Sequence, residues 1–116
     1  MMGFIRTRII YPYMRKKRFK GMNIGPWYWV LPELPYMIEN YIEAHEQTHV
    51  DQFWRTWGLA PIRSIFDKKY YLKMEVEAYR AAIKAGQDIS SAAYWLANLY
   101  GFKIKIDEAH DMLLGD

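Results

Sequence analysis

Cysteine is absent from this chain of 116 residues, which excludes both a disulfide framework and a metal site built on thiolates. A metal ion would have to be held by histidine, aspartate, glutamate or backbone oxygens. Nowhere do about eighteen apolar residues follow one another, the length that a membrane-spanning helix needs. Arg6 and Arg8 interrupt the apolar run that a signal peptide requires soon after Met1. We therefore expect a soluble, cytoplasmic protein with no membrane segment.

Apolar residues are abundant, at 52% of the chain, and aromatic residues make up 17%. This is enough to bury a core without disulfides or other covalent staples. A chain of this length also falls within the usual size of one domain. We expect a single domain over residues 1–116.

Basic residues are unevenly distributed, although the formal net charge is only +3. Five cations lie close together: Arg15, Lys16, Lys17, Arg18 and Lys20. Such a cluster could contact the phosphates of a nucleic acid. A solvated turn between two strands is the alternative, and short basic runs are weak motifs.

The N-terminal third favours extended structure. Residues 3–13 mix aliphatic and charged side chains in a pattern that suits a strand better than a helix. Residues 22–31 form a second extended segment, in which Gly25-Pro26 suggests an edge position or a bulge. A small antiparallel sheet is expected here.

Two long helical segments follow. The first begins at Pro35, whose fixed φ suits the first helical position, and ends at residue 57 before Gly58. The second runs from about Pro61 to Gly86, and a polar and aromatic run at 67–71 could break it. The expected inward positions are Ile38, Ile42, His45, His49 and Phe53 on the first segment, and Leu72, Glu75, Tyr79 and Ile83 on the second.

The C-terminal part favours shorter elements. Ser90 or Ser91 can cap a third helix that runs through Tyr100 and ends at Gly101. Residues 102–106 alternate like a short strand, and residues 107–114 favour a helix. The expected fold is therefore α+β, with a small N-terminal antiparallel sheet, two long helices and further C-terminal helices.

The run His45-Glu46-Gln47-Thr48-His49 has the H-E-x-x-H spacing, which puts two imidazoles one turn apart on one helix face. Neutral imidazole nitrogens at this separation can share one zinc ion. Glu46 follows the first histidine and can accept a proton from a metal-bound water, as a general base. Histidines that bind no metal are the alternative.

A zinc site with an open position needs a third protein ligand, and the second long helix offers Glu75 and Glu77. Residues two apart on a helix point to roughly opposite sides. Glu75 shares the inward stripe with Tyr79, whereas Glu77 lies with Lys73 on the polar face. Glu75 is therefore the preferred ligand, and Glu77 an exposed acid that could pair with Lys73 or Arg80.

These motifs carry a family resemblance. H-E-x-x-H from His45 to His49, followed by E-x-x-A from Glu75, resembles the gluzincin branch of the zinc metallopeptidases. The longer patterns H-E-x-x-H-x-x-Q, ending at Gln52, and E-x-E-A-Y, from Glu75, resemble small uncharacterised minimal-gluzincin domains of bacteria and phages. The resemblance covers roughly residues 38–83. It implies a zincin-like fold with a short sheet before the metal helix.

The resemblance further implies that His45, His49 and Glu75 bind one Zn²⁺ per chain. Glu46 would then activate a zinc-bound water, and the substrate would be a peptide or protein. Other first-row metals can also occupy a site of nitrogen and oxygen ligands.

The chain departs from the family where many gluzincins have an aspartate four residues after the ligand glutamate, because Tyr79 occupies that position. Gln52, one turn past His49, is a candidate to orient a metal-bound imidazole instead. Peptide hydrolysis also needs a donor that stabilises the oxyanion. The candidate donors are Tyr70, Tyr71, Tyr79 and His110, each of which could equally be a packing or surface residue.

Three hypotheses about function follow from the sequence. The preferred one is a zinc-dependent hydrolase, specifically a metallopeptidase. The second is an inactive zincin whose metal stabilises a small fold or a binding surface. The third is a basic module that binds a nucleic acid or a partner through the cluster at residues 15–20.

Overall fold

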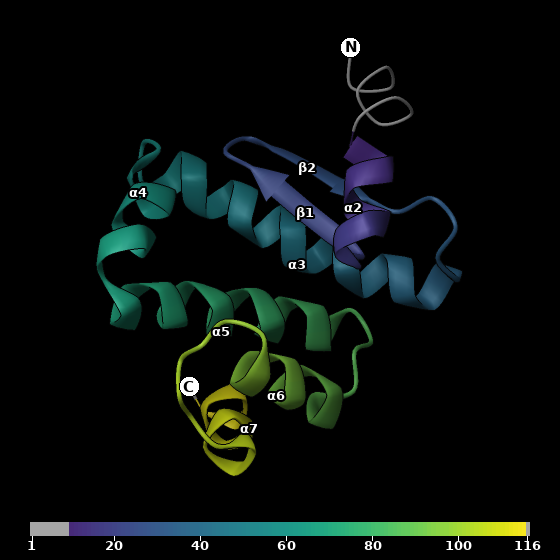
Figure 1. Ribbon diagram of the computed structural model, residues 1–116. Coiled ribbons are helices and arrows are strands. Elements are labelled where there is room, and N and C mark those ends of the chain that lie inside the picture. The colour runs from purple at the N-terminus through teal and green to yellow at the C-terminus, as the bar shows by residue number, and fades with distance from the viewer. Residues whose placement is uncertain (1–9, 116) are drawn as a thin grey trace.

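A computed structural model describes residues 10–115 and shows the α+β architecture expected from the sequence (Figure 1). Within this range a short helix precedes a two-stranded sheet, and five further helices follow. The elements are α2 Tyr11–Lys17, β1 Gly21–Ile24, β2 Trp27–Val30, α3 Tyr36–Arg55, α4 Leu59–Phe66, α5 Lys68–Lys84, α6 Ile89–Asn98 and α7 Ile106–Leu114. None of the described helices is long and apolar enough to cross a membrane.

The segment before the sheet contains a helix where the sequence predicted a strand. Residues 3–9 of that predicted strand lie outside the described residues, and the prediction was wrong for residues 11–13, which belong to α2. Pro12 suits the first turn of a helix. Tyr11 and Met14, three residues apart, form one buried face. The basic run ends α2 and leads into β1, so it does not connect two strands.

The sheet is a hairpin made from the second predicted segment alone. β1 and β2 pair antiparallel, from Gly21 opposite Val30 to Ile24 opposite Trp27. Gly25 has a φ of 56°, which glycine adopts without strain, and Pro26 completes the two-residue connection. A glycine at the first central position suits the tight turns that match strand twist. Gly25-Pro26 is therefore the turn between two strands that are both edge strands of the described sheet, and the alternative of a bulge was wrong.

A hydrophobic cluster joins α2 to the hairpin. Met14 is fully buried, and Trp29 from β2 is 4% exposed. The buried members of the cluster are Ile10, Tyr11, Met14, Trp29 and Leu31. Trp29 therefore has a packing role.

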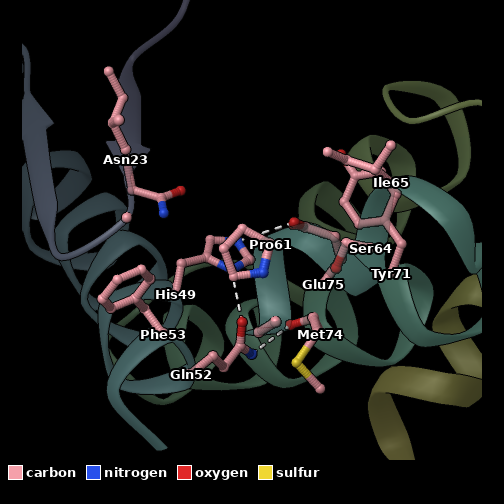
Figure 2. A pocket seen from close by; sticks show the side chains of 13 residues that line it. Asn23, His49, Gln52, Phe53, Pro61, Ser64, Ile65, Tyr71, Met74 and Glu75 are labelled. Carbon is pink, nitrogen blue, oxygen red and sulfur yellow. Dashed lines mark hydrogen bonds and ion pairs between the residues drawn. The ribbon is translucent and has the colours of Figure 1, made fainter. Parts of the chain in front are cut away.

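The long helices α3 and α5 lie side by side, and the hairpin packs on α3 away from α5 (Figure 1). Side chains of α3, such as His49, face side chains of α5, such as Glu75 (Figure 2). Asp67 separates α4 from α5, as the expected break indicated. Its carboxylate accepts a hydrogen bond of 3.1 Å from the backbone N–H of Tyr70 and so caps α5. This pair of helices positions the candidate site.

Helices α6 and α7 pack on α5 around a second cluster. Its buried members are Tyr79, Ala92, Ala93, Leu96, Ala109 and Leu113. The predicted strand at residues 102–106 was wrong: residues 102–105 form an irregular connection, in which Lys103 has a φ of 61°, and Ile106 begins α7. The alternation arose because Phe102 and Ile104 both pack on this cluster. Asp88, and neither of the predicted serines, caps α6.

Candidate metal centre

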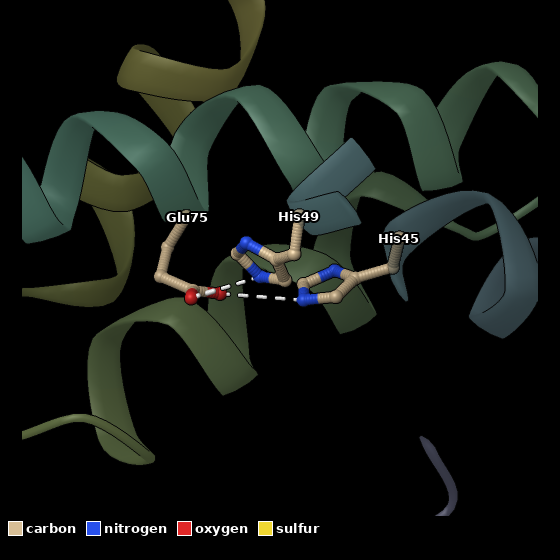
Figure 3. Close-up of side chains that lie close together, drawn as sticks. All are labelled: His45, His49 and Glu75. Carbon is tan, nitrogen blue, oxygen red and sulfur yellow. Dashed lines mark ion pairs between the residues drawn. The ribbon is translucent and has the colours of Figure 1, made fainter. Parts of the chain in front are cut away.

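Helices α3 and α5 bring His45, His49 and Glu75 together in one buried group (Figure 3). The two histidines are one turn apart on α3, and the glutamate reaches them from α5. Nε2 of His49 lies 3.0 Å from Oε2 of Glu75, and Nε2 of His45 lies 3.3 Å from Oε1. The candidate ligand atoms all lie within 4.8 Å of one another.

The donor set and its spacing fit a zinc ion. Two imidazole nitrogens and one carboxylate are ligands that zinc accepts, and three protein ligands leave a fourth position open. Ligand atoms about 2.0–2.1 Å from a tetrahedral zinc lie about 3.3 Å from one another, close to the separations seen here. Nε2 of His45 lies 3.3 Å from Oε1 of Glu75 without hydrogen-bond geometry, so this buried oxygen has no hydrogen-bond partner among the described residues. A cation between these groups would satisfy this oxygen.

The cluster perturbs the pKa values of its members in opposite directions. Burial alone would raise the pKa of Glu75, but the imidazoles of His45 and His49 outweigh this effect and lower it to about 2. Burial alone would lower the pKa of His49, but the Glu75 carboxylate outweighs it and raises that pKa to about 9. Without a metal ion, His49 therefore keeps its proton at neutral pH, and a metal would have to displace it.

Gln52 orients His49 from the side opposite Glu75 (Figure 2). Its Oε1 lies 2.9 Å from Nδ1 of His49, while its Nε2 donates to the backbone oxygen of Met74 and to Glu77, both at 3.0 Å. Because the amide nitrogen has two acceptors, its oxygen faces the imidazole and accepts from Nδ1–H. This tautomer leaves Nε2 of His49 free to bind a metal.

Glu77 is part of this network and is not brought to the histidines. Besides Gln52, it accepts hydrogen bonds of 3.0 and 2.8 Å from Arg55. The expected pairing with Lys73 or Arg80 was wrong, because α3 supplies its partners. The chain Arg55, Glu77, Gln52, His49 thus runs from the surface to the candidate ligand.

Glu46, the expected general base, is buried beside the two histidines. It is 8% exposed, and burial raises its pKa although the neighbouring imidazoles act to lower it. A carboxyl whose pKa lies closer to neutrality is better matched to proton transfer near pH 7. β1 approaches this side chain closely: a Cβ at Gly21 would lie 3.0 Å from Oε2 of Glu46 and 2.5 Å from Ile42.

Two cavities flank the cluster. His49 and Glu75 line a cavity of about 480 Å³ whose other walls include Phe53, Pro61 and Ile65, and we call it the apolar cavity (Figure 2). His45 and Glu46 line a second cavity of about 360 Å³, which also includes Lys17, Arg18, Lys20, Gln87 and Tyr100, and we call it the basic cavity. A small molecule or a chain segment therefore has room on either side.

The candidate oxyanion donors are placed differently. Tyr71 lines the apolar cavity and Tyr79 lines the basic cavity, whereas Tyr70 and His110 line neither. The ring of Tyr70 lies against Arg63, and His110 is part of α7.

Tyr100 was not among the sequence candidates. It lines the basic cavity, and its hydroxyl lies 2.9 Å from that of Tyr79. Burial, with the nearby Glu75 carboxylate adding to it, raises the pKa of Tyr100 well above its usual value. The hydroxyl therefore keeps its proton at neutral pH and can act as a donor.

No family model, no curated protein and no solved structure matches this chain. The metallopeptidase resemblance therefore rests on the motifs and on the geometry of the cluster. What the structure itself defines is a buried His, His, Glu group on two adjacent helices, arranged as an H-E-x-x-H motif with a downstream glutamate requires.

Proposed function

We propose that this chain is a zinc-dependent hydrolase that cleaves peptide bonds. The observation that carries the proposal is the convergence of His45, His49 and Glu75, with Glu46 buried next to them. The cavities on both sides support it further, because a peptide could reach the cluster from either one. A purely structural metal would not need this access.

Each residue has a distinct task in this mechanism. His45, His49 and Glu75 would hold the ion, and a bound zinc ion supplies a Lewis acid that polarises a carbonyl and acidifies water. Glu46 accepts the proton of the attacking water and returns it to the leaving amine. Tyr100, which lines the same cavity as Glu46, is the proposed donor to the developing oxyanion.

The test begins with the metal content of protein purified without chelators or a histidine tag. We expect about one zinc per chain, lost in Glu75→Ala and retained in Glu77→Ala. A screen against peptide libraries should then detect cleavage by the native chain but not by Glu46→Gln, which keeps the metal. A chain that binds no zinc when zinc is supplied would overturn the proposal.

A structural metal is the second candidate function. It is favoured by the position of the ligands, which come from α3 and α5 and would tie these two helices together. It predicts one bound zinc, no cleavage of any peptide, and the same thermal stability gain from zinc in Glu46→Gln as in the native chain.

A further inference from the structure

The basic cavity is lined by cations and by the candidate catalytic group, Glu46. Lys17, Arg18 and Lys20 line it, and none of them has an ion-pair partner among residues 10–115. Arg15, by contrast, is paired with Glu33 and does not line the cavity. Among the described residues that line it, Glu46 is the only acidic one. The cavity therefore presents an excess of positive charge to whatever enters it.

The size and walls of the cavity favour a short chain over a nucleic acid duplex. A volume of about 360 Å³ holds a few side chains. The walls also include Trp95 and Leu99, which offer apolar contact to side chains.

A buried amide belongs to the lining of the same cavity. Gln87 is 7% exposed, and its Oε1 has no hydrogen-bond partner among the described residues. Buried acceptors of this kind are costly unless a donor reaches them. The backbone N–H of an extended peptide is such a donor, whereas the sugar-phosphate backbone of DNA carries no hydrogen-bond donor.

Arg18 is held at the rim in an unfavourable backbone conformation. It ends α2 with φ 64° and ψ 31°, where glycine is the usual residue. Strained residues of this kind persist at ligand sites when the side chain is needed there.

We infer that the basic cavity binds an acidic segment of the substrate, with Lys17, Arg18 and Lys20 contacting its carboxylates and Gln87 its backbone. The inference rests on the proposed function, because it places the scissile bond beside His45 and Glu46. It assigns a substrate class to the site: peptides with aspartate or glutamate a few residues from the cleaved bond.

The first experiment measures binding to zinc-loaded Glu46→Gln, which should not turn substrate over. A fluorescent peptide with two glutamates is compared with the same peptide carrying glutamines, in low salt and in high salt. Exposed charge pairs contribute about 2-fold to 5-fold each, so we expect the acidic peptide to bind about tenfold more tightly in low salt. The preference should shrink as salt screens the charges. Equal affinities in low salt would overturn the inference.

Variants of the cations identify the source of the preference. In the same background, replacing Lys17, Arg18 and Lys20 together by glutamine should remove the preference, whereas Lys16→Gln, which lies outside the cavity, should leave it intact. Arg18→Gly is the more specific test, because it removes the charged side chain and also relieves the backbone strain. It should be at least as stable as its parent and yet lose about 2-fold to 5-fold of the preference. A preference that survives the triple replacement would contradict the inference.

Two further results separate this inference from its alternatives. Tighter binding of a single-stranded oligonucleotide than of the acidic peptide would overturn it in favour of a nucleic-acid surface. Cleavage by the native chain of acidic and neutral peptides at equal rates would refute the inference and leave the proposed function standing. An acidic preference in binding, with no cleavage of any peptide, would refute the proposed function alone.

Discussion

Replacing Gln52 by leucine should weaken zinc binding without opening a hole in the protein. Gln52 is 2% exposed, and its amide links His49 to Met74 and Glu77 by contacts of 2.9 to 3.0 Å. Leucine has a similar volume, so the main loss is polar. The buried Nδ1–H of His49 is left without its acceptor, which lowers the unfolding free energy by about 1–3 kcal/mol. Glu77 keeps Arg55 and is half exposed, so it adds little.

We therefore expect the unfolding free energy to fall by about 2 kcal/mol. Zinc affinity should fall about 10-fold to 100-fold, the usual effect of removing a group that orients a ligand histidine. The stability assay is urea unfolding in the presence of a chelator, and the affinity assay is competition with a chromophoric chelator. Gln47→Leu is the matched control, because Gln47 is exposed on the same helix and its side chain donates to Asp51, away from the candidate ligands.

The exchange Gln52→Glu with Glu77→Gln tests the orientation itself. The new carboxylate can accept from Nδ1–H of His49 and from the new amide, so affinity should recover in the double variant. Gln52→Glu alone places two carboxylates about 3 Å apart and should be the less stable protein. If Gln52→Leu folds and binds zinc within about twofold of the native chain, Gln52 does not position His49 and the reasoning fails.

Two other perturbations follow from the same site. In chelator-treated protein the raised pKa of His49 stabilises the fold fully below about pH 6.5, and this stabilisation should be lost as the pH rises through about 9. The lowered pKa of Glu75 stabilises the fold above about pH 4.5, and this stabilisation should be lost as the pH falls toward about 2. Urea titrations across pH should show both losses, and zinc-loaded protein should lack the alkaline one, since its imidazoles have already released their protons. Gly21→Ala should cost about 1–3 kcal/mol, because the new methyl group would lie 2.5 Å from Ile42 and 3.0 Å from Glu46. A chemical-denaturation midpoint equal to that of the native chain would show that β1 can move away from the helix.

The grouping of candidate ligands on each helix could be predicted, because local helix geometry alone determines which residues share a face. Residues four and three apart lie together on a helix, which aligns His45 with His49 and His49 with Gln52. Glu75 was selected over Glu77 by the same argument. These predictions needed no knowledge of how the two helices meet.

Contacts that depend on tertiary packing could not be predicted in this way. Glu77 reaches Gln52 and Arg55 only because α3 and α5 pack closely along their length, so a residue expected on the polar face lies at the edge of their interface. Tyr100 follows α6 and enters the basic cavity because α6 packs back on α5. No residue spacing in the sequence indicates that α6 packs back on α5.

The N-terminal helix was missed for a different reason. Residues 11–13 are part of a short segment in which aromatic residues favour a strand. The helix forms instead because Met14 and Tyr11 bury one face against Trp29, a contact from a distant strand. Short segments have too few turns for helical periodicity to outweigh such propensities.

The two candidate ligand histidines are held by different means, and Tyr79, four residues after Glu75, takes part in one of them. A hydrogen bond from Nδ1 to Gln52 orients His49. The ring of Tyr79 instead packs edge-on against His45, with centroids 4.4 Å apart, and its hydroxyl is directed to Tyr100. An aromatic contact restricts the tilt of an imidazole without drawing charge from it. The imidazole beside Glu46 is therefore positioned by packing, and the one beside the apolar cavity by a polar network.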